Sequence, residues 1–328
     1  MNDDELTARL RAARPQTPSR GQLLDARQES LLTQIIAQPV AVGIGGGSTR
    51  RGPGWHARSI WLAAASVMLV LVLGALGSIA LFPPSAAVAA TPKLLSPEPI
   101  GGTAKENLMT ISDALRDAGS TAGGPIRFHT WALAFDGDAA TPPRYIVPEE
   151  HEIDYLPDGS VSITVRAGVP YDPDGDPVAD PSPAPGTALW SLVQEPADVV
   201  LIFEPAPTEV SQFDEFFQTS GVVPSRTSGE YFSAIRLLLS EQALSREQEV
   251  ALIGFLATLP DITVDGAVTD RLGREGVAFS TESRTPGEYR DTLVLSASAG
   301  ILSYEVTYIG SSRTDIQAPA IIEYIAWE

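Results

Sequence analysis

The chain has no cysteine among its 328 residues and only three histidines. Disulfide bridges, thiol catalysis and thiolate metal sites are therefore excluded. Basic residues are also scarce, because 22 Lys and Arg stand against 41 Asp and Glu, which gives a formal net charge of -19. Nucleic acid repels a chain this acidic, so we expect no nucleic-acid partner.

One long stretch has no charged residue at all. It covers the 23 residues 60–82 and is followed directly by Pro83 and Pro84. As a helix it would be about 34 Å long, enough to cross a hydrocarbon core of roughly 30 Å. We therefore predict one transmembrane helix over residues 59–82.

The charges that flank this stretch predict its orientation. Arg50 and Arg51 precede it, whereas the first positive residue after it is Lys93. Positive residues gather on the cytoplasmic side of a span. We expect a cell-membrane protein with a cytoplasmic N-terminus and with residues 83–328 outside. These outer residues hold 14 basic against 36 acidic side chains, and residues 1–58 hold 8 Arg against 5 acids.

A cleaved signal peptide is the alternative interpretation of the apolar stretch. Residues 86–90 (AAVAA) are small enough for signal peptidase. However, the apolar region of a signal peptide usually has only about 7–15 residues and lies close to the N-terminus. An uncleaved anchor is therefore favoured.

The sequence divides into four segments. Residues 1–58 form a cytoplasmic segment with two short helices and a glycine-rich linker at 43–48 (GIGGGS). Two such helices bury little surface between themselves, so we expect them either to be partly disordered or to need a partner. The transmembrane helix 59–82, a Pro-rich spacer 83–102 and an extracytoplasmic domain 103–328 complete the chain.

The outer domain shows strand patterns, then helix patterns, then strand patterns. Thr103 and Glu106 form a capping box that starts a first helix, and residues 157–159 (PDG) form the turn of a hairpin. This order predicts one α+β domain whose antiparallel sheet is covered on one face by helices, like a half-barrel. The expected strands cover residues 126–135, 144–155, 161–165, 262–269, 276–280, 292–295, 302–308 and 320–327, and the later helices residues 208–220, 230–239 and 245–259.

Two groups of residues resemble metal sites. The acidic run at 172–180 has its glycine and its twelfth position in the wrong places for a calcium loop, which favours a solvated loop. Two histidines and a nearby carboxylate could hold zinc, but alternate positions of a strand face water as often as each other. We expect no metal and no cofactor. The groups are Asp172, Asp174, Asp176 and Asp180, and His129, His151, Glu149, Glu150, Glu152 and Asp154.

No pattern of catalytic residues stands out. The Gly-x-Ser-x-Gly elbow of hydrolases does not occur, and 36 outer acids make any catalytic pair an arbitrary choice, so we do not expect an enzyme. Apolar residues at helical spacing normally form core. As an alternative, they line a pocket for an apolar ligand between helices and sheet. The candidates are Phe213, Phe217, Ile235, Leu238, Leu252, Phe255, Leu302, Tyr304 and Val306.

Several short motifs occur in order after the predicted span. They are residues 90–95 (ATPKLL), 131–133 (WAL), 157–159 (PDG), 168–170 (GVP), 269–280 (TDRLGREGVAFS), 299–302 (AGIL) and 319–324 (PAIIEY). Together they resemble a group of poorly characterised actinobacterial single-pass membrane proteins that often accompany extracytoplasmic-function sigma factors. This anti-sigma-like resemblance implies an outer domain similar to the half-barrel of lipoprotein carriers and of periplasmic regulators of anti-sigma factors.

The inner segment departs from zinc-type anti-sigma factors. Those proteins carry a His-x-x-x-Cys-x-x-Cys motif, and this chain has no cysteine. We expect a single-pass regulatory or sensory protein that modulates a sigma factor through residues 1–58. The alternative is a membrane-tethered module without a signalling role, whose outer domain binds a lipid-like small molecule or an envelope protein.

Overall fold

A computed structural model of the chain describes residues 89–118, 124–133, 145–313 and 316–328. Contacts divide the chain into two units, Met1–Ile79 and Ala80–Glu328, and every described residue belongs to the second. The predicted inner helices and the span at 59–82 lie outside the described residues. Within the described ranges, no helix is both long and apolar enough to cross a bilayer.

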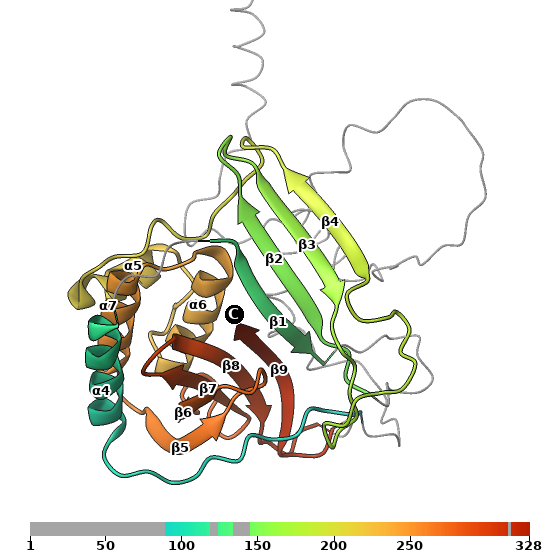
Figure 1. Cartoon of the computed structure of the whole chain (residues 1–328). Helices are drawn as coiled ribbons and strands as arrows, with labels where there is room; N and C mark the ends of the chain where they lie inside the picture. Colours follow the sequence, from blue (N-terminus) through green and yellow to red (C-terminus); the bar gives the residue numbers. More distant parts are fainter. Residues whose placement is uncertain (1–88, 119–123, 134–144, 314–315) are drawn as a thin grey trace, which may run out of the picture. The chain divides into compact units, whose positions relative to one another are not determined.

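The described part folds as an α+β domain around an open sheet of nine antiparallel strands (Figure 1). Their order across the sheet is β4-β3-β2-β1-β9-β8-β7-β6-β5, so the first and last of the described strands pair near its centre. The predicted antiparallel α+β class is confirmed. The strands are β1 (Ile126–Ala132), β2 (Glu149–Tyr155), β3 (Val161–Ala167), β4 (Ala188–Gln194), β5 (Thr263–Thr269), β6 (Glu275–Thr281), β7 (Tyr289–Ser296), β8 (Gly300–Tyr308) and β9 (Ala320–Trp327).

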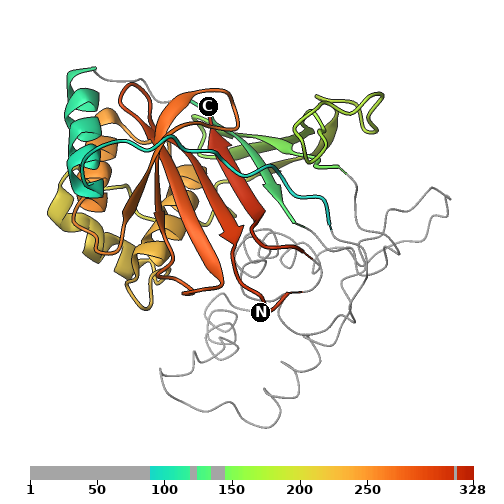
Figure 2. The same ribbon diagram turned by 90° about the horizontal axis from the view of Figure 1, so that it is seen from below.

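The helices lie on one face of this sheet, against β1, β5, β7 and β8, while β2 to β4 extend beyond them (Figure 1 and Figure 2). Three of them begin with complete capping boxes, in which Thr103, Thr227 and Ser245 satisfy the first backbone N–H groups. The boxes at Thr103 and Ser245 were predicted. The helices are α4 (Ala104–Asp117), α5 (Phe213–Thr219), α6 (Ser228–Glu241) and α7 (Arg246–Leu256), with a 3-10 turn η1 (Val210–Gln212) before α5.

The predicted elements match most of this architecture, but β4 was missed. Its residues, ALWSLVQ, place two apolar side chains next to each other at either side of Ser191 and so lack the alternation expected of a strand. This segment is a strand because it pairs antiparallel with β3, from Val161↔Gln194 to Arg166↔Ala188. Pairing with a neighbour, rather than a local pattern, defines this strand.

Strand β1 is buried on both faces. Phe128 packs in the main core beneath the helices, whereas Trp131 packs on the opposite, outer face with Ile146 and Tyr324. The register of β1 with both neighbours is continuous. The apolar residues of the predicted strand 126–135 change parity between Phe128 and Trp131, which the sequence alone explains either by a bulge or by burial on both faces. The structure supports burial on both faces.

The described end of the predicted spacer is part of the domain. Ala89 is buried against Tyr308, and Leu95 packs on the outer face of the sheet. Glu98 then exchanges two backbone hydrogen bonds with Ala267 of β5, at 2.7 and 2.8 Å. Gly266 permits this approach, because a Cβ there would lie 2.1 Å from the Glu98 carbonyl oxygen. We call residues 89–99 the strap.

Candidate functional site

The residues that the sequence proposed for an apolar pocket lie in closely packed core. Phe213, Phe217 and Phe255 have rings about 6 Å apart (5.9 to 6.0 Å) and are at most 4% exposed. Their neighbours in the same cluster are buried to the same degree. These neighbours are Ile235, Leu238, Leu252, Tyr304 and Val306.

Leu302 was grouped with Tyr304 and Val306 by alternation, and the structure places it on the other face. Strand β8 pairs Ile301 with Leu295 and Ser303 with Val294, so Leu302 has no opposite residue. This extra residue is a β-bulge, which changes the parity of the strand. Leu302 therefore packs on the outer face with Val294, and its assignment to the helix-facing pocket was wrong.

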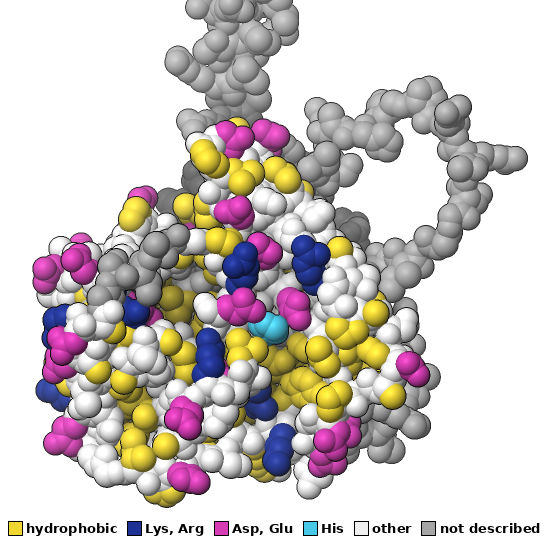
Figure 3. Space-filling view, in the orientation of Figure 1, with side chains coloured by type: hydrophobic (Ala, Val, Ile, Leu, Met, Phe, Trp, Pro, Cys, Tyr) yellow, Lys and Arg dark blue, Asp and Glu magenta, His cyan; other side chains and the backbone are white. Residues whose placement is uncertain are grey.

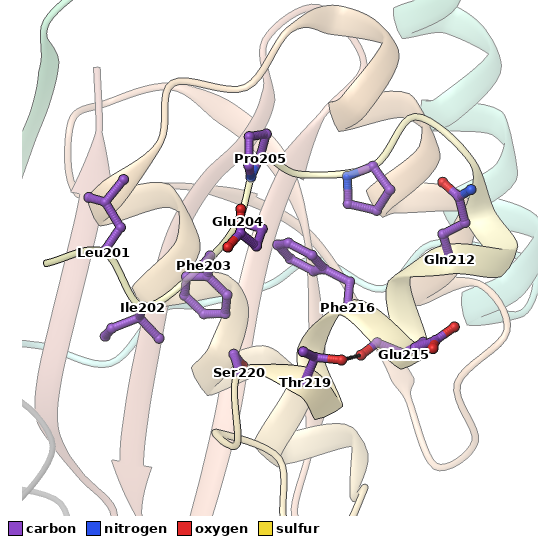
Figure 4. A pocket seen from close by; sticks show the side chains of 11 residues that line it. Leu201, Ile202, Phe203, Glu204, Pro205, Gln212, Glu215, Phe216, Thr219 and Ser220 are labelled. Atoms are coloured by element: carbon purple, nitrogen blue, oxygen red, sulfur yellow. Dashed lines mark hydrogen bonds between the residues drawn. The ribbon is translucent and has the colours of Figure 1, made fainter.

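A pocket of about 590 Å³ lies elsewhere, at the surface between the segment after β4 and helix α5 (Figure 4). The stacked rings of Phe203 and Phe216, with centroids 5.6 Å apart, form its apolar centre. Among the described residues that line it, two carboxylates, Glu204 and Glu215, are the charged groups, and there is no Lys or Arg. The remaining lining residues are Leu201, Ile202, Pro205, Pro207, Gln212, Thr219 and Ser220.

The end of helix α6 fastens one wall of this pocket. The Glu241 carboxylate accepts a hydrogen bond from the Phe203 amide at 3.3 Å, and the Gln242 side chain donates to the Glu204 carbonyl at 2.8 Å. Burial raises the pKa of Glu241, and hydrogen bonds from the Phe203 and Ile202 backbones oppose the rise. Glu241 and Gln242, at the end of helix α6, therefore hold the pocket wall formed by Phe203 and Glu204 in place.

A second cluster of polar groups lies inside the domain, between helix α6 and the sheet. Asp291 is fully buried and accepts hydrogen bonds from Arg284 at 2.7 and 3.1 Å and from the Tyr304 hydroxyl at 2.6 Å. Burial raises the pKa of Asp291, and the Arg284 guanidinium opposes this. Arg236 of α6 pairs nearby with Glu323 at 3.3 Å. Each buried charge in this cluster thus has a partner of opposite charge, which offsets the cost of its lost hydration. We therefore interpret the cluster as structural.

The residues considered for zinc do not converge. His129 contacts Glu328 at 3.0 Å, and His151 contacts Glu149 at 2.9 Å. Phe128 of the core lies opposite His151 in the register, so His151 faces the helix side and His129 the outer side. Over β1 to β3, charged side chains of both signs and a histidine gather on the outer face (Figure 3). No group of three potential ligands that could hold a metal was found in the part of the chain that the structure describes.

The acidic run at 172–180 forms a local turn. The carboxylate of Asp172 accepts hydrogen bonds from the amides of Asp174 and Asp176, both at 3.0 Å. A side chain that bonds its own backbone two residues on is typical of an Asx turn. The predicted exposed loop agrees with the exposure of residues 173–177.

Sequence reasoning missed the pocket beside helix α5. Residues 201–207 (LIFEPAP) were left between predicted elements, because prolines at 205 and 207 exclude a regular strand or helix. Leu201, Ile202 and Phe203 in succession were the available signal. Comparisons with protein-family models, with curated proteins and with solved structures gave no match, so the site stands on its own geometry.

Proposed function

We propose that this chain is a single-pass membrane sensory or regulatory protein that modulates an extracytoplasmic-function sigma factor. In this proposal residues 89–328 receive a signal outside the cell, residues 59–82 cross the membrane and residues 1–58 contact the sigma factor. The observation that supports it best is the strap. A chain that leaves the membrane at residue 82 would enter the fold within seven residues, at Ala89.

The strap gives such a protein a direct connection between domain and membrane. Its backbone bonds at Glu98 and its apolar contacts at Ala89 and Leu95 attach it to strands of the sheet. A shift of those strands would therefore pull on the chain that leads to the span. The helices lie together on one side of strands β5 to β9 (Figure 2), which is the layering that the resemblance to half-barrel domains implies.

Protease protection and capture of the sigma factor test this proposal together. In cells with a permeable outer envelope, added protease should remove an epitope placed after residue 328 and spare one at the N-terminus. The full-length chain should retain a co-expressed sigma factor, and a chain that lacks residues 1–58 should not. Protection of the C-terminal epitope, or equal retention by both chains, would contradict the proposal.

The pocket beside α5 favours a second candidate function, a membrane-tethered module that binds an apolar ligand. Its aromatic centre suits a planar or aliphatic group, and the two glutamates in its wall disfavour a fatty-acid carboxylate. We therefore expect a neutral or cationic apolar ligand. This function needs the outer domain alone and would survive failure of the sigma-factor test.

Replacement of one pocket residue tests this second function. Phe216→Ala removes an aromatic ring from the pocket, so the affinity for a neutral apolar dye such as Nile red should fall about tenfold or more. The measurement is a fluorescence titration of the full-length chain. Met109→Ala, which truncates an exposed side chain on α4, is the control and should leave the affinity unchanged. Equal dye binding by both variants would show that the pocket is not the binding site.

A further inference from the structure

The two edges of the sheet differ in how they are protected. The edge at β5 is covered in part by the strap, through the hydrogen-bonded pair Glu98 and Ala267. The edge at β4 has no further strand beside it among the described residues (Figure 1). Its outward N–H and C=O groups are therefore available for another strand, which is the usual liability of a sheet edge.

The side chains of β4 are apolar and exposed. Leu189 is 40% exposed, Trp190 38%, Leu192 42% and Val193 59%. Natural edge strands usually carry charged residues that discourage pairing, whereas Ala188–Gln194 has no charge at all. An uncharged, apolar and open edge is thus an interaction surface for an extended strand.

We propose that β4 pairs antiparallel with β4 of a second copy of this chain, around a two-fold axis at Ser191. In this register Trp190 lies opposite Leu192 of the other copy. Both side chains point to the helix side of the sheet, because they lie opposite Val165 and Ile163 of β3. Each apolar side chain on that face then meets another apolar side chain, as stable cross-strand pairs require.

Neighbouring positions favour the same register. Leu189, at a bulge next to β3, would lie opposite Val193, and Glu195 would lie opposite Thr187. A register centred on Leu192 would instead place Trp190 against Gln194 and Glu195 against Leu189. Of these two registers, the one centred on Ser191 keeps the apolar residues together.

Charge also permits this pairing although the outer segment as a whole is acidic. In the proposed register the Glu195 residues of the two copies are eight positions apart, or about 27 Å along a strand. This is more than three times the Debye length of about 8 Å at physiological ionic strength. One strand from each copy buries much less than the roughly 1,600 Å² of a standard interface, so we expect a weak, concentration-dependent dimer.

Because the chain has no cysteine, a single introduced thiol reports the register directly. Opposite residues of antiparallel strands have Cα atoms about 4.5–5.5 Å apart, within the range of roughly 4.4–6.8 Å that a disulfide spans, so Ser191→Cys can form a disulfide with its copy. The full-length variant should give a cross-linked dimer on a non-reducing gel after mild oxidation of expressing cells. Ser298→Cys, in the exposed turn between β7 and β8, is the control and should stay monomeric.

Charge substitutions then test which residues face each other. In the Ser191→Cys background, Trp190→Lys or Leu192→Glu alone should lower the dimer yield about tenfold, because two-fold symmetry introduces each change twice. The two together should restore most of it, because each new lysine then lies opposite a new glutamate. A Ser191→Cys chain that cross-links no more than Ser298→Cys, a dimer that forms through Leu192→Cys instead, or a double variant without recovery would overturn the proposal.

Discussion

Asp291→Ala is expected to lower the free energy of unfolding by about 3–5 kcal/mol, because it breaks a buried ion pair by removing one partner. The substitution leaves the Arg284 guanidinium, which is 18% exposed, without its carboxylate. It also removes the acceptor of the buried Tyr304 hydroxyl. A buried charge without its partner keeps the full cost of its lost hydration. Urea denaturation of the full-length chain, followed by tryptophan fluorescence, measures the change.

The same hairpin contains a matched control. Arg290 and Glu282 form an ion pair of similar length, 2.8 Å, but their side chains are 46% and 41% exposed. Water screens such a pair, so Glu282→Ala should cost at most about 1 kcal/mol. Similar losses for Asp291→Ala and Glu282→Ala would mean that burial does not determine the contribution of these pairs.

Phe217→Ala is expected to cost about 3–5 kcal/mol, because the cluster around the ring cannot collapse into the space it leaves. Phe217 is 0% exposed and its ring contacts those of Phe213, Phe255 and Tyr231, with centroids 5.9 to 6.0 Å apart. These residues join α5, α6 and α7. Loss of the Phe217 ring would weaken the packing of these three helices against one another. The measurements are the melting temperature and the urea midpoint, and both should fall.

The adjacent residue, Phe216, allows the same Phe→Ala substitution to be compared at a less buried position. Phe216 is only partly buried and lines the surface pocket. Phe216→Ala should therefore destabilise the domain much less than Phe217→Ala while it weakens dye binding. The opposite ranking would show that the ring of Phe216, rather than that of Phe217, supports the packing of the helices.

Local signals in the sequence determined the elements that depend on neighbours along the chain. The capping boxes at Thr103 and Ser245 each involve residues three positions apart, so they were readable without tertiary contacts. The strand at 320–327 and the hairpin turn at 157–159 were also predicted, because alternation and turn chemistry are local properties. These elements were enough to predict the α+β class.

Tertiary contacts decided the rest. The pairing of β1 with β9 joins residues almost 200 positions apart, and no local pattern records such a partner. β4 exists because β3 offers it a free edge, and the strap belongs to the domain because Gly266 leaves room for the Glu98 carbonyl. The bulge at Leu302 reversed a face that alternation had assigned. Helical spacing in the sequence indicates which side chains share a face, but only tertiary packing decides whether that face lines a cavity or fills the core. The candidate pocket residues on the helices fill the core.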